Sequence, residues 1–247
     1  GFQNVFVLDL SETALFNIQK RMPSFPKEQL IHQNFFDFEG SFDVISMIHV
    51  LEHLVDPLEV LKEIKTSLTS TGKLFIQVPS YQKNPFDLLI YDHASFFSQE
   101  SLQHLLGRVG FRVVEMNEDW VSKEISAVCT VNENETSSYC VSDSIFDIKK
   151  IVVGHERYLT SIVTEAHNKL LENNKVKIFG SSIGACWLAA EIGIDSVLCF
   201  LDEDTNRCGG ELFGVPIRKP IKEDYQDTVI PLDLQTRAKV LRRIYGS

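Results

Sequence analysis

The sequence predicts an α/β protein made of two doubly wound units in tandem. Short apolar runs alternate with segments of helical spacing in both halves of the chain, the pattern of a largely parallel sheet covered by helices. The 247 residues are 44% hydrophobic and 23% charged, which suffices for sizeable cores. A polar, turn-rich segment, "NENETSSYCVSDS" (132–144), separates the halves.

The first half opens with a short apolar strand, residues 5–10, and a helix, "SETALFNIQKRM", for which Ser11 is a suitable N-cap. Residues 28–38, "EQLIHQNFFDF", predict a second strand and a loop. In "FDVISMIHV" (42–50) the apolar run is almost continuous, which predicts a third strand with both faces covered.

Pro57 then stands at the first position of a helix, where its missing N–H costs nothing. "STG" (70–72) predicts a turn before a fourth strand, "KLFIQVP". A helix ending at Gly110 and two closing strands, "FRVVEMN" and "SAVCTVN", complete the first unit.

The second half begins with a long helical stretch, residues 145–173, and continues into "KVKIFGSSIGACWLAAEIGIDSVLCFLDED". This is a strand, a glycine-containing turn, a helix and a strand that ends in acid, and it predicts a second βαβ unit. The predicted divisions are therefore a first domain over 1–133, a linker with its helix over 134–174, and a second, smaller domain over 175–247.

Charge and composition exclude several classes of protein. A formal net charge of -10 argues against nucleic acid as a partner, since such proteins carry a basic footprint. No apolar stretch reaches the roughly 18 residues of a membrane helix, so no membrane partner is expected. Five cysteines without metal-ligand spacing predict reduced thiols in a cytoplasmic protein and no metal site.

Acidic residues lie at the ends of the first two predicted strands, at the edge where α/β sheets bind ligands. Asp9 could accept the hydroxyls of a ribose, or it could be a surface acid near a helix N-terminus. Asp37 lies among phenylalanines, in a loop that could offer an adenine one polar contact and apolar faces. The same aromatic residues could instead simply cap the core.

The third strand runs into "MIHVLEHLVDP" (47–57), which places His49, Glu52 and His53 at the same edge of the sheet. They could line the ligand crevice, or they could be solvated residues that enter a helix. The segment "FDVISMIHVLEHLVDPLEVLKEIKTSLTSTGKLFIQVPS" resembles the central region of class I S-adenosylmethionine-dependent methyltransferases, and the resemblance covers about residues 1–130.

This resemblance implies a Rossmann-like sheet, an enzyme, and S-adenosylmethionine as the cofactor. It implies that Asp9 and Leu10 contact the ribose, that Phe36 and Asp37 contact the adenine, and that His49 lies beside the methionine portion. His49 and Glu52 would also face the acceptor. The family's first strand and glycine-rich loop should precede Gly1, so we expect this chain to be an N-terminally truncated methyltransferase.

The second half, together with "DHASFFS" (92–98), is similar to sugar C-methyltransferases, which act on nucleotide-linked keto-sugars and carry a C-terminal Rossmann-like domain. The resemblance implies that His93 is the base near the sugar, with Asp92 in the place of the family's acid. Ile90 stands where relatives have a tyrosine, which leaves O- or N-methylation open as alternatives. As a base, a histidine is suited to removing a proton next to a ketone.

Two other classes of function remain as alternatives. An NAD-dependent oxidoreductase could use the second βαβ unit, although "GSSIGA" is not a full dinucleotide fingerprint. A non-catalytic nucleotide-binding module would keep the sheet without the chemistry. Three basic residues could meet a diphosphate or could simply be solvated: Arg207, Arg218 and Lys219.

Overall fold

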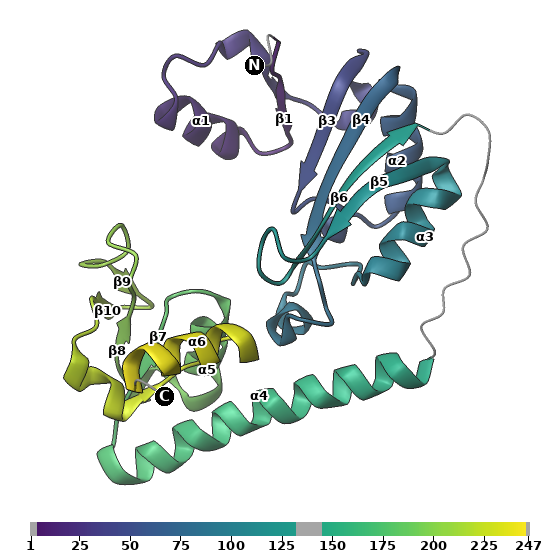
Figure 1. Ribbon diagram of the computed structural model, residues 1–247. Helices are drawn as coiled ribbons and strands as arrows, with labels where there is room; N and C mark the ends of the chain where they lie inside the picture. Colours follow the sequence, from purple (N-terminus) through teal and green to yellow (C-terminus); the bar gives the residue numbers. More distant parts are fainter. Residues whose placement is uncertain (1–3, 132–144, 246–247) are drawn as a thin grey trace.

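The computed structural model describes residues 4–131 and 145–245, and the strands of this part of the chain form three separate sheets (Figure 1). A two-stranded sheet and a four-stranded sheet belong to the first half, and a five-stranded sheet belongs to the second half. Among these residues no helix is both long and apolar enough to cross a membrane.

The two-stranded sheet pairs β1 (Val7–Asp9) with β2 (Leu30–His32) in parallel. Between them lies α1 (Glu12–Arg21), and the Ser11 hydroxyl accepts a hydrogen bond from the backbone N–H of Ala14, as expected of the N-cap. Both strands are shorter than the sequence predicts, because the flanking residues form loops and two short 3₁₀ helices: η1 (Lys27–Gln29) and η2 (Phe35–Asp37).

The four-stranded sheet has the order β3-β4-β6-β5. β3 (Phe42–Ile48) and β4 (Leu68–Pro79) are parallel, whereas β6 (Glu124–Val131) is antiparallel to both β4 and β5 (Phe111–Asn117). Two helices, α2 (Pro57–Thr66) and α3 (Gln99–Val109), pack against one face of this sheet (Figure 1). Their buried leucines and isoleucines share one core with the strands: Leu61, Ile64, Leu102, Leu106, Leu74 and Ile76.

Two expectations for this sheet are wrong. The segment 70–72 is not a turn, because the chain already reverses at Ser67, whose carbonyl accepts a hydrogen bond from the N–H of Phe42. The following residues continue β4 as an irregular extended stretch. The second error concerns β3, which is covered on one face only: Met47 is buried among the helices, while Val44 and Ile48 are exposed.

The second half forms around α4 (Ile145–Asn173), the helix that the sequence predicts. β7 (Val176–Phe179), α5 (Ile183–Ile192) and β8 (Val197–Leu201) make the expected βαβ unit with parallel strands. Three further strands and a helix extend it: β9 (Glu211–Leu212), β10 (Val215–Arg218), β11 (Thr228–Val229) and α6 (Leu234–Tyr245). The predicted boundary in 132–144 lies outside the described residues.

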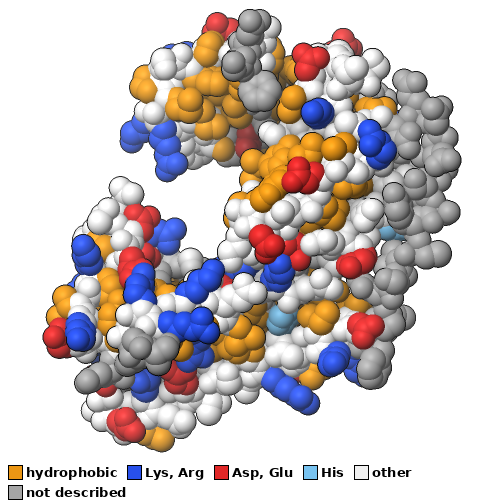
Figure 2. Space-filling view, in the orientation of Figure 1, with side chains coloured by type: hydrophobic (Ala, Val, Ile, Leu, Met, Phe, Trp, Pro, Cys, Tyr) orange, Lys and Arg blue, Asp and Glu red, His pale blue; other side chains and the backbone are white. Residues whose placement is uncertain are grey.

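A short helix of the first half, η4 (Pro85–Leu89), packs on the second half. The ring of Phe86 lies 5.9 Å from that of Trp187 on α5, and a Cβ built on Gly184 would be 2.3 Å from the Pro231 carbonyl oxygen and 3.0 Å from the Phe86 ring. His155 on α4 adds a hydrogen bond to the Tyr81 carbonyl. Beside this contact Figure 2 shows a wide hollow between the N-terminal part and the second half.

Candidate functional site

The site is built at the carboxyl end of β3, where the chain leaves the sheet in an unusual backbone conformation. The N–H of His49 bonds to the carbonyl of Gln77, and His49 has φ 53, in the left-handed region that non-glycine residues seldom adopt. The next residues form η3 (Leu51–His53), anchored by the fully buried Leu51. Such local strain is typical of functional sites, because surrounding structure has to hold it in place.

Glu52 is the central side chain of this loop, with only 1% of its surface exposed. Its Oε1 lies 3.1 Å from Nδ1 of His49, and the other ring nitrogen of His49 lies 3.7 Å from Oε2 of Glu124. The backbone carbonyl of Glu52 accepts hydrogen bonds from the N–H groups of Ala94 and Ser95. These bonds fix the loop that carries His93 beside η3.

His93 forms a buried pair with an acid that the sequence did not single out. Its Nδ1 lies 2.8 Å from Oδ1 of Asp87, and the two side chains are 5% and 1% exposed. Burial raises the pKa of the Asp87 carboxyl, although the neighbouring imidazole acts against this rise. The ring of His53 packs edge-on against His93 at 4.8 Å, and Nδ1 of His53 faces both the carbonyl and the carboxylate of Asp92.

Glu124, at the start of β6, is the second acid that sequence reasoning missed. Burial raises its pKa to about 7, and the buried Glu52 carboxylate adds to the rise, while His49 and Lys123 oppose it. The sequence does contain a signal for Glu124, because this acid is the first residue of a largely apolar strand, "EISAVCTV". For Asp87, the signal was an acid within the apolar segment "PFDLL".

The residues expected to bind the cofactor lie on the separate β1–β2 sheet and the loop after it. Asp9 accepts a hydrogen bond from the N–H of Ser11 through Oδ1, which leaves Oδ2 for a ribose hydroxyl. Leu10 and Phe36 are exposed apolar side chains, and Asp37 is exposed beside them. This combination fits a nucleoside, since a carboxylate oxygen and uncovered apolar surface are both present.

The cofactor residues and the catalytic residues form two groups. Within 4–131 and 145–245, no hydrogen bond or ion pair joins Asp9 or Asp37 to the group around Glu52. His49, Glu52 and His93, by contrast, are brought together as the strand-end pattern predicts, because Glu52 contacts both His49 and the loop after His93.

The second βαβ unit uses its polar residues for internal contacts. Asp202 accepts a hydrogen bond from the Ser181 hydroxyl and pairs with Arg207 at 3.6 Å. Burial acts to raise the pKa of Asp202, but these partners outweigh it and lower the pKa. Arg218 donates to the sulfur of Cys199. The second glycine of "GSSIGA", Gly184, lets Phe86 and the Pro231 carbonyl approach α5 closely, so packing accounts for it without a dinucleotide.

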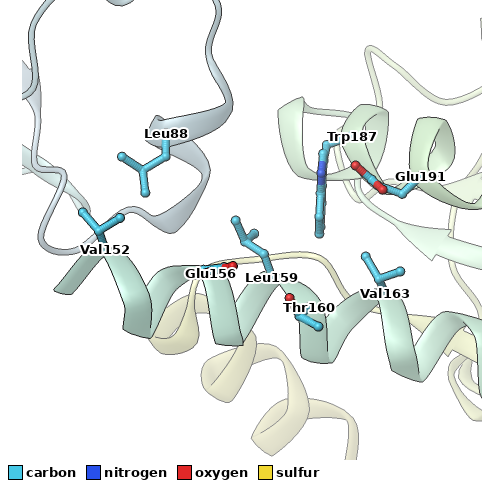
Figure 3. A pocket seen from close by; sticks show the side chains of 8 residues that line it. All are labelled: Leu88, Val152, Glu156, Leu159, Thr160, Val163, Trp187 and Glu191. Carbon is cyan, nitrogen blue, oxygen red and sulfur yellow. The ribbon is translucent and has the colours of Figure 1, made fainter. Parts of the chain in front are cut away.

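A cavity of about 440 Å³ lies elsewhere, between η4 and the two helices α4 and α5 (Figure 3). Five apolar side chains, two acids and a threonine line it: Leu88, Val152, Leu159, Val163, Trp187, Glu156, Glu191 and Thr160. None of the expected catalytic or cofactor residues lines it.

Comparison with known proteins identifies the first half. Residues 1–116 match the family model of a methyltransferase domain. No curated protein matches the chain. Residues 1–116 therefore form a methyltransferase domain, an enzyme domain whose cofactor is S-adenosylmethionine.

Similar solved structures include a S-adenosylmethionine-dependent methyltransferase from Clostridium acetobutylicum, with 12% identity and a TM-score of 0.43, covering 53% of this chain and 76% of that one. A methyltransferase from Streptomyces caelestis has 12% identity and a TM-score of 0.44, covering 52% and 75%. An O-methyltransferase of neocarzinostatin biosynthesis has 17% identity and a TM-score of 0.44, but only 41% of its length is covered, against 51% of this chain. Similarity at this level assigns no substrate and no residue role.

Proposed function

We propose that this protein transfers a methyl group from S-adenosylmethionine to a carbon next to a ketone in a small molecule, a nucleotide-linked keto-sugar. The observation that carries the proposal is the buried Asp87–His93 pair, held beside Glu52 at the carboxyl end of β3. In α/β sheets this is the edge at which ligands bind.

His93 acts as the general base in this proposal. When Nδ1 donates its hydrogen to Asp87, the lone pair of the neutral imidazole is on Nε2. Asp87 fixes this tautomer and stabilises the imidazolium that forms when Nε2 takes a proton. Both side chains are buried, so water competes poorly for that nitrogen.

The proposed reaction balances without another reagent. His93 Nε2 takes the α-proton of the keto-sugar, and the electron pair of the broken C–H bond forms the new C–C bond to the methyl carbon. When bound, S-adenosylmethionine supplies this methyl group in electrophilic form, because the S–CH3 bond that breaks leaves its electron pair on the sulfur. His49 and Glu52 line the acceptor side of the site, where the His49 ring remains half-exposed.

The cofactor would be held by Asp9 and Leu10 at the ribose and by Phe36 and Asp37 at the adenine. A strand with a glycine-rich loop, lying between β1 and β3, would complete this site. Two features support such a strand: β1 and β3 belong to different sheets, and β3 is an edge strand of its own sheet. A longer chain that contains this strand should bind the cofactor more tightly than residues 1–247 alone.

The second half would form a smaller Rossmann-like domain that frames the nucleotide-sugar. Its parallel βαβ unit and the hollow that it borders support this role (Figure 2). The four described cysteines are free thiols, which suits a reducing compartment such as the cytoplasm.

The test is His93→Gln, measured on a panel of nucleotide-linked keto-sugars. Turnover should fall by about 10²–10⁴-fold, the usual contribution of a general base, while cofactor affinity stays nearly unchanged. The wild-type protein should also exchange the acceptor's α-proton with deuterated solvent, and the variant should not. His167→Gln, which changes an exposed histidine on α4, is the matched control.

Two results would overturn parts of the proposal. Full activity in His93→Gln would show that His93 is not the general base. A product methylated on oxygen or nitrogen would replace C-methylation by one of its alternatives and would leave the methyltransferase assignment intact.

A further inference from the structure

Three side chains of the site converge in a way that general base catalysis does not require. Glu52 and His53 come from η3, and His93 comes from the loop after η4. One potential metal-ligand atom from each of them lies within 4.8 Å of the others. Two imidazoles and a carboxylate form a donor set that suits divalent transition metals such as zinc.

The second observation is the hydrogen bonding of the two histidines. Nδ1 of His93 bonds to the carboxylate of Asp87, and Nδ1 of His53 bonds to Asp92. In the described part of the chain, no hydrogen bond occupies Nε2 of either ring. Histidines that bind metals almost always have one ring nitrogen held by a carboxylate or a carbonyl, as both rings are here.

The third observation is an unpaired oxygen at the centre of the group. Oε2 of Glu52 is buried and has no hydrogen-bond partner within 4–131 and 145–245, whereas Oε1 is held by His49. A buried polar atom without a partner is costly, and a charged one more so. A bound cation would satisfy this oxygen.

We propose that Glu52 Oε2, His53 Nε2 and His93 Nε2 form a binding site for a divalent transition-metal ion of the zinc class. With metal–ligand bonds of about 2.0–2.1 Å, tetrahedral ligands stand about 3.4 Å apart, so ligand atoms that lie up to 4.8 Å apart have to move together by as much as roughly 1.4 Å. The half-exposed ring of His53 has the room to make this movement. The two nitrogen ligands favour zinc over magnesium or calcium, which take oxygen ligands.

Metal binding has a consequence for the proposed reaction, and this part rests on the proposed function. The metal would take the Nε2 lone pair of His93, the same lone pair that accepts the substrate proton. A chain with bound zinc therefore has no free base. Zinc should act as an inhibitor that competes with proton transfer and leaves cofactor binding intact.

The decisive experiment is a zinc titration of the chelator-treated protein by calorimetry, without substrate or cofactor. The wild-type chain should bind one zinc ion, and His53→Gln should weaken this binding by at least tenfold because it removes one ligand. Asp92→Asn should weaken it by about 10–100-fold, as loss of an outer partner of a metal-bound histidine does. His53 and Asp92 are partly exposed, so both variants should fold, which circular dichroism can check.

His167→Gln is the control for zinc bound by scattered surface histidines, and it should bind like the wild type. The proposal fails if wild-type affinity is no higher than that of His53→Gln, or if His167→Gln loses as much as His53→Gln. In an activity assay, each protein's rate is compared with its own rate without zinc. The zinc concentration that halves this rate should be about 10–100-fold higher for Asp92→Asn than for the wild type. An inactive preparation would count against the proposed function alone, because the titration needs no turnover.

Discussion

His93 and Asp87 meet through an Nδ1–Oδ1 contact of 2.8 Å, with both side chains almost fully shielded from solvent. A carboxylate this deeply buried is stable only with a partner, and burial accordingly raises its pKa. The imidazole is therefore the natural partner of this acid. The loop 90–95, which follows η4 directly and bonds to the Glu52 carbonyl, holds the imidazole in place.

Asp87→Asn should show how much the charge of Asp87 contributes to catalysis, apart from the size of its side chain. The amide keeps the size of the side chain but removes the charge that stabilises the imidazolium, so kcat should fall by about 10²–10⁴-fold. Solvent exchange of the acceptor's α-proton should fall in parallel, while the affinity for S-adenosylmethionine stays the same. Asp119→Asn is the matched control, because that carboxylate is 94% exposed. Normal exchange in Asp87→Asn would show that Asp87 does not position the base.

Asp9→Ala should weaken binding of S-adenosylmethionine by roughly 10–100-fold. A hydrogen bond to a charged group contributes about 1.5–3 kcal/mol, and this carboxylate has one oxygen not used by Ser11. Calorimetry measures the change, with the exposed Glu39→Ala as control. Equal affinities for wild type and Asp9→Ala would remove the ribose assignment.

Gly184→Ala should destabilise the contact between the two halves. The added Cβ would lie 2.3 Å from the Pro231 carbonyl oxygen, a backbone atom that cannot move alone, so we expect a loss of about 1–3 kcal/mol in the free energy of unfolding. Gly154→Ala on α4 is the matched control, since its Cβ would meet nothing within 4 Å. There the change should stabilise the helix by up to about 1 kcal/mol. Urea denaturation compares the two, and equal effects would contradict the packing role of Gly184.

Periodicity alone predicted much of the fold. The βαβ unit of the second half and the helix over 145–173 could be predicted because their apolar spacing is regular, and in the βαβ unit Gly180 and Gly193 follow the strand and the helix. Whether one or both faces of β3 are covered could not be predicted, because an apolar strand can have the same sequence in either case. The turn predicted at "STG" was wrong for a related reason: turn residues also occur in an irregular strand, and the chain has already reversed at Ser67.

The candidate site was predictable where it follows strand ends and unpredictable where it depends on packing. His49 and Glu52 follow β3 directly, so the topology of an α/β sheet brings them to the ligand edge. Asp87 belongs to a five-residue 3₁₀ helix with no periodic pattern, and its contact with His93 depends on how that helix packs against α4 and α5. The sequence marks Asp87 as an acid in an apolar segment, but no local signal tells which residue this acid contacts.

Glu124 should make the stability of the protein depend on pH in an unusual direction. Burial raises the pKa of its carboxyl in the folded protein to about 7, with Glu52 and Asp87 adding to the rise and His49 and Lys123 opposing it, from the ordinary value of 4.5. Between these two pH values the folded state binds the proton and the unfolded state does not. The free energy of unfolding must therefore fall as pH rises from about 4.5 to about 7.

Glu124→Gln removes this titration, so its free energy of unfolding should fall less over the same range. The difference between wild type and variant should be on the order of 1–3 kcal/mol, because one pKa unit corresponds to 1.36 kcal/mol and partial solvent access reduces the effect. Urea denaturation at several pH values between 4.5 and 8 measures it, with Glu115→Gln, an exposed residue on β5, as control. If wild type and Glu124→Gln lose stability in parallel as pH rises, Glu124 ionises normally in the folded protein and has no part in the electrostatics of the site.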